Sequence, residues 1–148
     1  MMFVLLYLHI LAMFTAVTVV MGSGILVLIG ARGGNRSVVA AITSLPIPRL
    51  AGPLYGVGGL FGLATAFVFG YNLLAPWLII AYVLFVLLTL LGIRVSGPIF
   101  ERTHEIASDP GTTSDAFGQA MNRFRLDAVV TLIGIALIIA DMVFKPFS

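Results

Sequence analysis

The sequence has no cysteine and few charged residues. Without cysteine there are no disulfides, thiolate metal sites, c-type haem attachments or cysteine nucleophiles. Charged residues make up 9% of the chain, whereas they make up about 25% of a typical soluble domain. The formal net charge of +2 is too small to indicate a nucleic-acid partner. The composition therefore predicts a protein whose main solvent is lipid.

The sequence also lacks a complete catalytic signature. It contains no HExxH zinc motif, no GxSxG nucleophile elbow and no glycine-lysine phosphate loop. No apolar stretch carries a central Glu or Lys of the kind expected in a small proton-coupled exporter. These absences leave enzyme activity unassigned and favour a non-enzymatic role.

Long apolar stretches make up most of the sequence. Four of them are close to or above the ~20 residues that a helix needs to cross a bilayer, at about residues 2–30, 50–71, 76–95 and 126–144. The first is too long for the core of a signal peptide, so we expect it to be retained. We predict an all-α membrane protein with a single domain over residues 1–148, folded as an antiparallel four-helix transmembrane bundle.

The basic residues predict the orientation. Seven of the eight lie in the two loops that follow the first and third spans: Arg32, Arg36, Arg49, Arg94, Arg102, Arg123 and Arg125. Because cytoplasmic loops are enriched in Lys and Arg, we expect a multi-pass protein of the bacterial plasma (inner) membrane with both termini outside. Tyr71 and Trp77 then fall at the outer boundary, where interfacial aromatic residues are common.

Both basic loops contain signals for local structure. Gly33-Gly34-Asn35 is expected to break the chain after the first span, and Pro46 and Pro48 to precede the second. The third span is expected to continue as residues 97–107 and to end at Asp109-Pro110-Gly111. Thr113 or Ser114 is then expected to cap a short amphipathic piece, residues 115–125, that leads into the fourth span. The charges in this loop are interpreted as a solvated face near the lipid headgroups.

The second span is rich in glycine. Gly52 and Gly56 form one small-xxx-small pair, and Gly58 and Gly62 form another. Such pairs let two helix backbones approach closely. They indicate a helix-packing interface, which serves either packing within this chain or the docking of another subunit or a second copy.

Polar residues recur on single faces of the spans. Asp127, Gly134 and Asp141 share one face of the fourth span, as Tyr82, Thr89 and Ser96 do in the third. Asp127 is interpreted as structural, because it lies in the first turn of its span with Arg123 one turn before it. Each face is expected to point into the bundle, because lipid solvates a carboxylate or an imidazole poorly.

His9, Tyr82 and Asp141 are expected at similar depth in the outer leaflet, where they would form a hydrogen-bonded cluster. Asp141 would orient one nitrogen of His9 and leave the other for haem, a metal or a proton. The alternatives are that His9 donates to a carbonyl of a neighbouring helix and that Asp141 is solvated near the surface. The three residues are the candidate cofactor-binding group. No residue is assigned as catalytic, and no separate metal site is assigned.

Three stretches resemble an uncharacterised bacterial integral membrane family, domain of unknown function twenty-two sixty-nine. They are LLYLHIL at residues 5–11, APWL at 75–78 and RVSGP at 94–98, and the resemblance extends over nearly the whole chain.

More distantly, a four-span bundle with a first-span histidine is similar to the membrane protoporphyrinogen oxidase that carries haem b, and to copper-resistance D-type membrane domains. The oxidase pairs that histidine with a lysine shortly after a third-span tryptophan. Here Ala81 and Tyr82 follow Trp77, so only His9 matches.

These observations favour a small accessory or structural subunit that docks onto a larger membrane assembly. One alternative is a redox protein that binds haem b or a metal through His9. Another is a carrier of a small solute or ion that uses the His9, Tyr82 and Asp141 group. The expected partners are membrane lipids and other membrane subunits or a second copy, with no nucleic acid.

Overall fold

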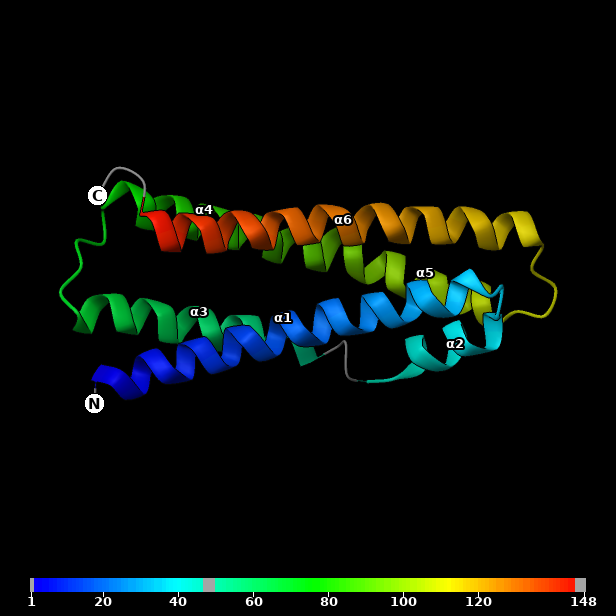
Figure 1. The fold of residues 1–148 in the computed structure, drawn as a ribbon, viewed down its shortest axis with the longest axis horizontal. Coiled ribbons are helices and arrows are strands. Elements are labelled where there is room, and N and C mark those ends of the chain that lie inside the picture. Colours follow the sequence, from blue (N-terminus) through cyan, green and yellow to red (C-terminus); the bar gives the residue numbers. More distant parts are fainter. Residues whose placement is uncertain (1, 47–49, 146–148) are drawn as a thin grey trace.

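The computed structural model describes residues 2–46 and 50–145, and this part of the chain is helical with no strand (Figure 1). The elements, in chain order, are α1 (Met2–Arg32), α2 (Arg36–Ser44), α3 (Ala51–Val68), α4 (Pro76–Leu91), a π-helical segment η2 (Gly92–Ser96), α5 (Gly97–Ser108) and α6 (Ser114–Phe144). The predicted all-α class is therefore confirmed.

Four helices within the described ranges are long and apolar enough to cross a membrane. They are α1, α3, the continuous helix α4–η2–α5 and α6, and each overlaps one of the four predicted spans. α3 ends at Val68, earlier than the predicted residue 71, because Gly70 adopts a positive φ of 71°. In that turn the Tyr71 N–H donates to the Ala66 carbonyl, a glycine-terminated helix end that leaves few carbonyls unpaired.

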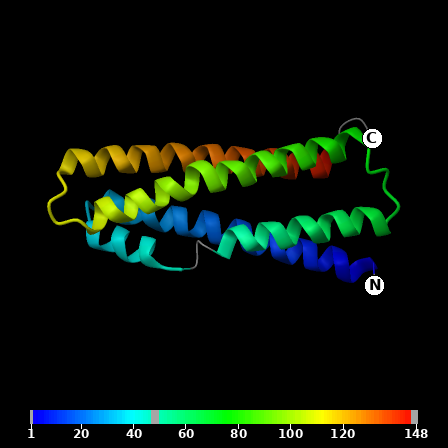
Figure 2. The same ribbon diagram turned by 180° about the vertical axis from the view of Figure 1, so that it is seen from behind.

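The spans associate as two pairs. α1 lies beside α3, and α4 lies beside α6, in both views of the molecule (Figures 1 and 2). α3 and α4 touch each other little, although they are consecutive. α4 fits α6 closely at Gly134, where a Cβ would collide with the side chain of Leu88. The loop at residues 69–75 joins the two pairs at one end of the molecule, together with the N-terminal end of α1 and the C-terminal end of α6 (Figure 1). We call this the termini end.

The other end, formed by α2, α5 and the first turns of α6, carries most of the basic residues and is called the basic end. Its helices enclose a core of Val27, Val39, Ala107, Phe117 and Phe124. Lys145, by contrast, lies at the termini end, where it follows α6 and contacts the rings of Tyr71 and Trp77. Pro48 and Arg49 fall outside the described residues.

α2 was not predicted from the sequence. Asn35 caps it, because its side chain accepts a hydrogen bond from the Val38 N–H at 3.4 Å. Val39 and Thr43 lie four residues apart on its buried face, and α2 packs against α1 and α5. Nine residues seldom form a stable helix alone, so tertiary packing stabilises α2.

The predicted extension of the third span is confirmed as α5, which reaches Ser108. Asp109 ends it and accepts the Gly111 N–H at 2.9 Å. Thr113 is the cap of α6, accepting the Ala116 N–H at 3.2 Å. The amphipathic piece expected at residues 115–125 is the beginning of α6 itself, which is continuous to Phe144.

Candidate functional site

His9 lies on α1 and contacts α3. Its Nδ1 is 2.7 Å from the Gly58 carbonyl oxygen. A carbonyl can only accept, so Nδ1 carries the proton of this bond, and in the neutral ring the lone pair is then on Nε2. Of the two predicted arrangements for His9, the structure has the hydrogen bond to a neighbouring helix carbonyl.

The glycines of α3 explain how His9 reaches that carbonyl. A Cβ at Gly62 would lie 2.8 Å from His9 Cε1, and a Cβ at Gly58 would lie 2.6 Å from the sulfur of Met13. Both glycines therefore bring α3 against α1 within the same chain. Gly52 and Gly56 differ, because a Cβ at either position would meet nothing within 4 Å. Only one of the two predicted glycine pairs is used for packing inside the described structure.

Asp141 is buried near the C-terminal end of α6, with 7% of its surface exposed. Neither of its carboxylate oxygens has a hydrogen-bond partner among the described residues, and neither does the buried hydroxyl of Tyr82. The direct hydrogen bond predicted from His9 to one of these two residues is therefore not formed. Asp141 is also not the surface carboxylate of the alternative interpretation.

Aromatic residues and Lys145 surround this end of α6. Tyr71 and Trp77 meet edge to face with ring centroids 5.6 Å apart, and the Lys145 Nζ lies 4.9 Å from the first centroid and 5.2 Å from the second. An ammonium at such distances is attracted by the ring faces. Lys145 is one turn beyond Asp141, yet its charge is directed to the rings and not to the carboxylate.

A second polar contact joins the spans nearer the basic end. The Ser96 hydroxyl, in η2, donates to the Asp127 carboxylate on α6 at 2.9 Å. The sequence placed both residues on inward faces but did not pair them. The seven-residue spacing of polar and small residues on each helix was the sequence signal for these two faces. Their contact is structural, because it links η2 to α6 and satisfies an acid that lipid would solvate poorly.

The described residues at the termini end offer one suitable ligand for a haem iron or another metal ion. The hydrogen bond to Gly58 leaves His9 Nε2 available, as metal-binding histidines usually are when their other nitrogen donates to a carbonyl. Within residues 2–46 and 50–145 there is no group of three His, Cys, Asp or Glu side chains that could hold a metal ion. The described residues would therefore offer His9 as one ligand, and any second ligand would have to come from elsewhere.

Residues 3–146 match the family described as "Predicted integral membrane protein (DUF2269)". The chain belongs to this family. No curated protein and no solved structure matches it. The family resemblance predicted from residues 5–11, 75–78 and 94–98 is confirmed, and the chain is an integral membrane protein. The more distant similarity to the haem b oxidase and the copper-resistance domains gains no support from these comparisons.

Proposed function

We propose that this family member is a small accessory subunit that docks onto a larger membrane assembly through the free face of α3. The supporting observation is the open space beside Gly52 and Gly56, where an added Cβ would meet nothing within 4 Å. Leu60 and Phe67 continue the same helix face and are 69% and 74% exposed. The face therefore combines a flat glycine section with a section of large apolar side chains.

This combination suits a partner transmembrane helix better than lipid alone. Lipid tails are as apolar as Leu, so helices associate in membranes through close packing. The glycine pair lets a partner backbone come close, and the bulky section offers side chains to interdigitate with it. Gly58 and Gly62 show how such a pair is used in this chain, where α1 is the neighbour.

The test compares matched glycine substitutions. Gly56→Leu fills the free face, whereas Gly24→Leu places the same side chain in open space on α1. Tagged chains are extracted from their native membranes in mild detergent, and the mass of the particle is measured. We expect the wild type and Gly24→Leu to run in a particle larger than one chain, and Gly56→Leu to run as the free subunit.

A wild-type particle with the mass of a single chain would contradict the docking proposal. So would an unchanged particle for Gly56→Leu. Because the chain has no cysteine, a cysteine at Leu60 carrying a photo-crosslinker provides a direct check. Its crosslinks should reach a second polypeptide and not only lipid.

In the membrane, we propose that the four helices form an antiparallel bundle with both termini outside. The distribution of basic residues supports this orientation. Single cysteines at Ser37 and Ser114 should be shielded from an impermeant thiol reagent added to whole cells, whereas one at Asn72 should react. The reverse labelling pattern would overturn the topology.

A second candidate function is a haem b or metal-binding redox role for His9. It is favoured by the hydrogen bond to Gly58, which fixes the ring and leaves Nε2 as a potential ligand. The purified protein should then show a Soret band that His9→Gln abolishes. His104→Gln is the control, because His104 bonds to Thr43 at the basic end. A wild-type protein without the band, after expression with haem supplied, would exclude haem binding.

A further inference from the structure

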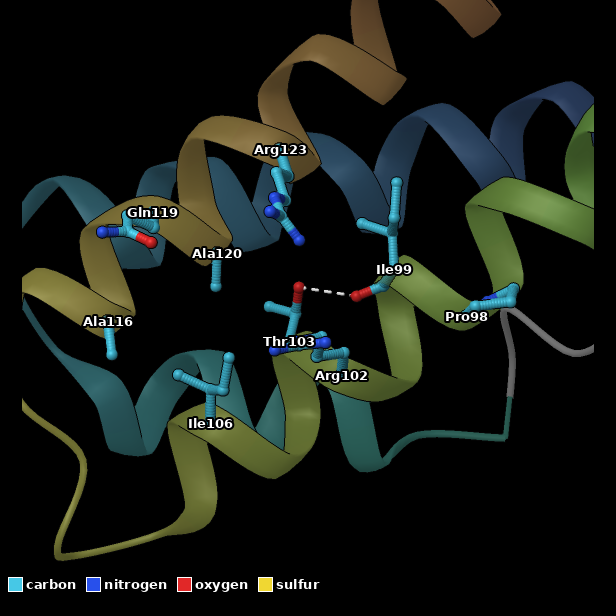
Figure 3. Close-up of a pocket in the computed structure, with 9 residues that line it drawn as sticks. All are labelled: Pro98, Ile99, Arg102, Thr103, Ile106, Ala116, Gln119, Ala120 and Arg123. Atoms are coloured by element: carbon cyan, nitrogen blue, oxygen red, sulfur yellow. Dashed lines mark hydrogen bonds between the residues drawn. The ribbon is translucent and has the colours of Figure 1, made fainter.

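A groove of about 220 Å³ lies between α5 and α6 at the basic end (Figure 3). Both helices contribute side chains to its lining, which combines five apolar residues with two arginines, a glutamine and a threonine. The lining residues are Pro98, Ile99, Arg102, Thr103, Ile106, Ala116, Gln119, Ala120 and Arg123. From the sequence, its two arginines were interpreted only as solvated surface charges.

The two arginines come from opposite walls. Figure 3 shows Arg123 extending from α6 toward α5, where Arg102 lies beside Thr103. The one hydrogen bond marked among the nine lining residues joins the Thr103 hydroxyl to the Ile99 carbonyl, at 2.8 Å within α5. Neither guanidinium is hydrogen-bonded within this lining. Each offers up to five N–H donors, in a planar fork that matches two oxygens of a phosphate.

The groove lies at the depth of lipid headgroups. Arg102 follows Pro76 by 26 residues, or roughly 39 Å of continuous helix at 1.5 Å per residue. Arg123 precedes Phe144 by 21 residues, or roughly 32 Å. The hydrocarbon core is about 30 Å thick, and the bilayer with its headgroups about 40–45 Å. By these lengths Arg123 lies close to the boundary of the hydrocarbon, and Arg102 lies further out, within the headgroup layer.

Two exposed apolar side chains lie on the membrane side of the groove. Val95 and Leu126 are exposed there, just beyond Pro98 and Arg123 along their helices. The Ser96–Asp127 hydrogen bond joins the two helices at this level. A molecule whose phosphate lies in the groove would thus meet an apolar surface in the direction of the bilayer.

We propose that the groove between α5 and α6 binds the phosphate of an anionic phospholipid. Arg102 and Arg123 contact the phosphate from opposite walls, and the Gln119 amide adds a donor at the rim. The acyl chains lie along Val95 and Leu126. Basic pockets between membrane helices commonly bind such headgroups. The apolar residues of the lining favour a lipid over free phosphate, and this proposal does not depend on the docking face of α3.

The experiment measures lipid affinity in the full-length chain. A fluorophore is attached to Gly118→Cys, an open position that does not line the groove. Phosphatidylglycerol is titrated into phosphatidylcholine–detergent micelles that hold the protein. We expect Arg102→Gln and Arg123→Gln each to weaken binding roughly tenfold, the effect of losing a charge-assisted hydrogen bond to the phosphate. Arg125→Gln is the matched control, because Arg125 is exposed on α6 and does not line the groove.

Equal losses in all three variants would mean diffuse attraction and would overturn the site. Excess inorganic phosphate should compete weakly, and competition as strong as that of the lipid would overturn the lipid assignment. Melting in phosphatidylcholine micelles checks folding. Arg102→Lys and Arg123→Lys replace any Gln variant that does not fold, since they keep the charge and lose the planar fork. Unweakened binding in the Lys variants would contradict the bidentate phosphate contact.

Discussion

The polar side chains at the two ends of the molecule differ in their hydrogen-bond partners. At the basic end, polar groups from different elements bond to each other: the Thr43 hydroxyl lies 3.0 Å from His104 Nδ1, and the Arg36 guanidinium donates to the Thr112 carbonyl. At the termini end, Asp141 and Tyr82 are buried without a hydrogen-bond partner among the described residues, and His9 bonds to a backbone carbonyl.

The paired polar side chains at the basic end contribute to the stability of the fold, whereas the unpaired side chains of Asp141 and Tyr82 do not. A buried polar group without a partner costs stability, whereas a paired one contributes modestly. The basic end is therefore specified by its side-chain bonds and its small core. The termini end is held by close helix contacts at Gly58, Gly62 and Gly134. Its unpaired acid and hydroxyl form no hydrogen bond that contributes to this packing.

Gly62→Leu should cause the largest change, because it breaks the helix contact at the termini end. The new side chain would displace the His9 ring and its hydrogen bond to Gly58. Overpacking of this kind costs about 1–3 kcal/mol. Thermal unfolding in detergent should show the loss. Gly24→Leu, whose added side chain meets open space on α1, should unfold as the wild type does, and equal losses in both variants would contradict the described α1–α3 contact.

Asp141→Val should change stability in the opposite direction. It removes a buried carboxylate that has no partner, so we expect a gain of about 1 kcal/mol, at the low end of the desolvation cost of such a group. Asp141→Asn keeps the polar burial and should gain less. A destabilised Asp141→Val variant would mean that the carboxylate has a structural partner in the native membrane.

Ser96→Ala should lower stability, because it removes the donor to Asp127. Side-chain hydrogen bonds between membrane helices contribute about 0.6 kcal/mol on average, with about 1.7 as the upper end. A double-mutant cycle with Asp127→Asn measures this coupling directly. Additive effects in the cycle would show that the two side chains do not interact.

Thr43→Val should have the smallest effect, a loss of about 0.5 kcal/mol, which is the low end for one hydrogen bond. It removes one bond between α2 and His104 but keeps the shape of the side chain. Ser44→Ala is the control, because that exposed hydroxyl bonds only to its own helix. Hydrogen exchange of the α2 amides should increase in Thr43→Val and not in Ser44→Ala. Unchanged exchange would show that α2 is held without this bond.

The long elements could be predicted from the sequence, and the short ones could not. Hydrophobicity and length predicted all four spans, and the Asp109 and Thr113 signals correctly placed the turn between α5 and α6. α2 was missed, although Asn35 before an apolar-periodic segment was a usable cap signal. η2 had no recognised signal, and its π-helical backbone is seen only in the structure.

The candidate site could also be predicted only in part from the sequence. The sequence identified His9, Tyr82 and Asp141 as inward-facing polar residues at similar depth, since their helices cross in alternating directions. It could not predict which groups would bond. Hydrogen bonds depend on distances of a few ångströms, and residue spacing on separate helices does not fix how the helices are rotated and paired. The cofactor-binding role of the three residues remains a prediction.

The sequence alone determined that this chain is a four-span membrane protein of its family, because the transfer of apolar segments into lipid depends on composition and length. Only the tertiary structure decided that α1 packs against Gly58 and Gly62, while the space beside Gly52 and Gly56 stays open. It also decided that Arg102 and Arg123 share a groove. The physical reason is that helix pairing depends on the complementary shapes of faces far apart in sequence, and those faces meet only in the folded chain.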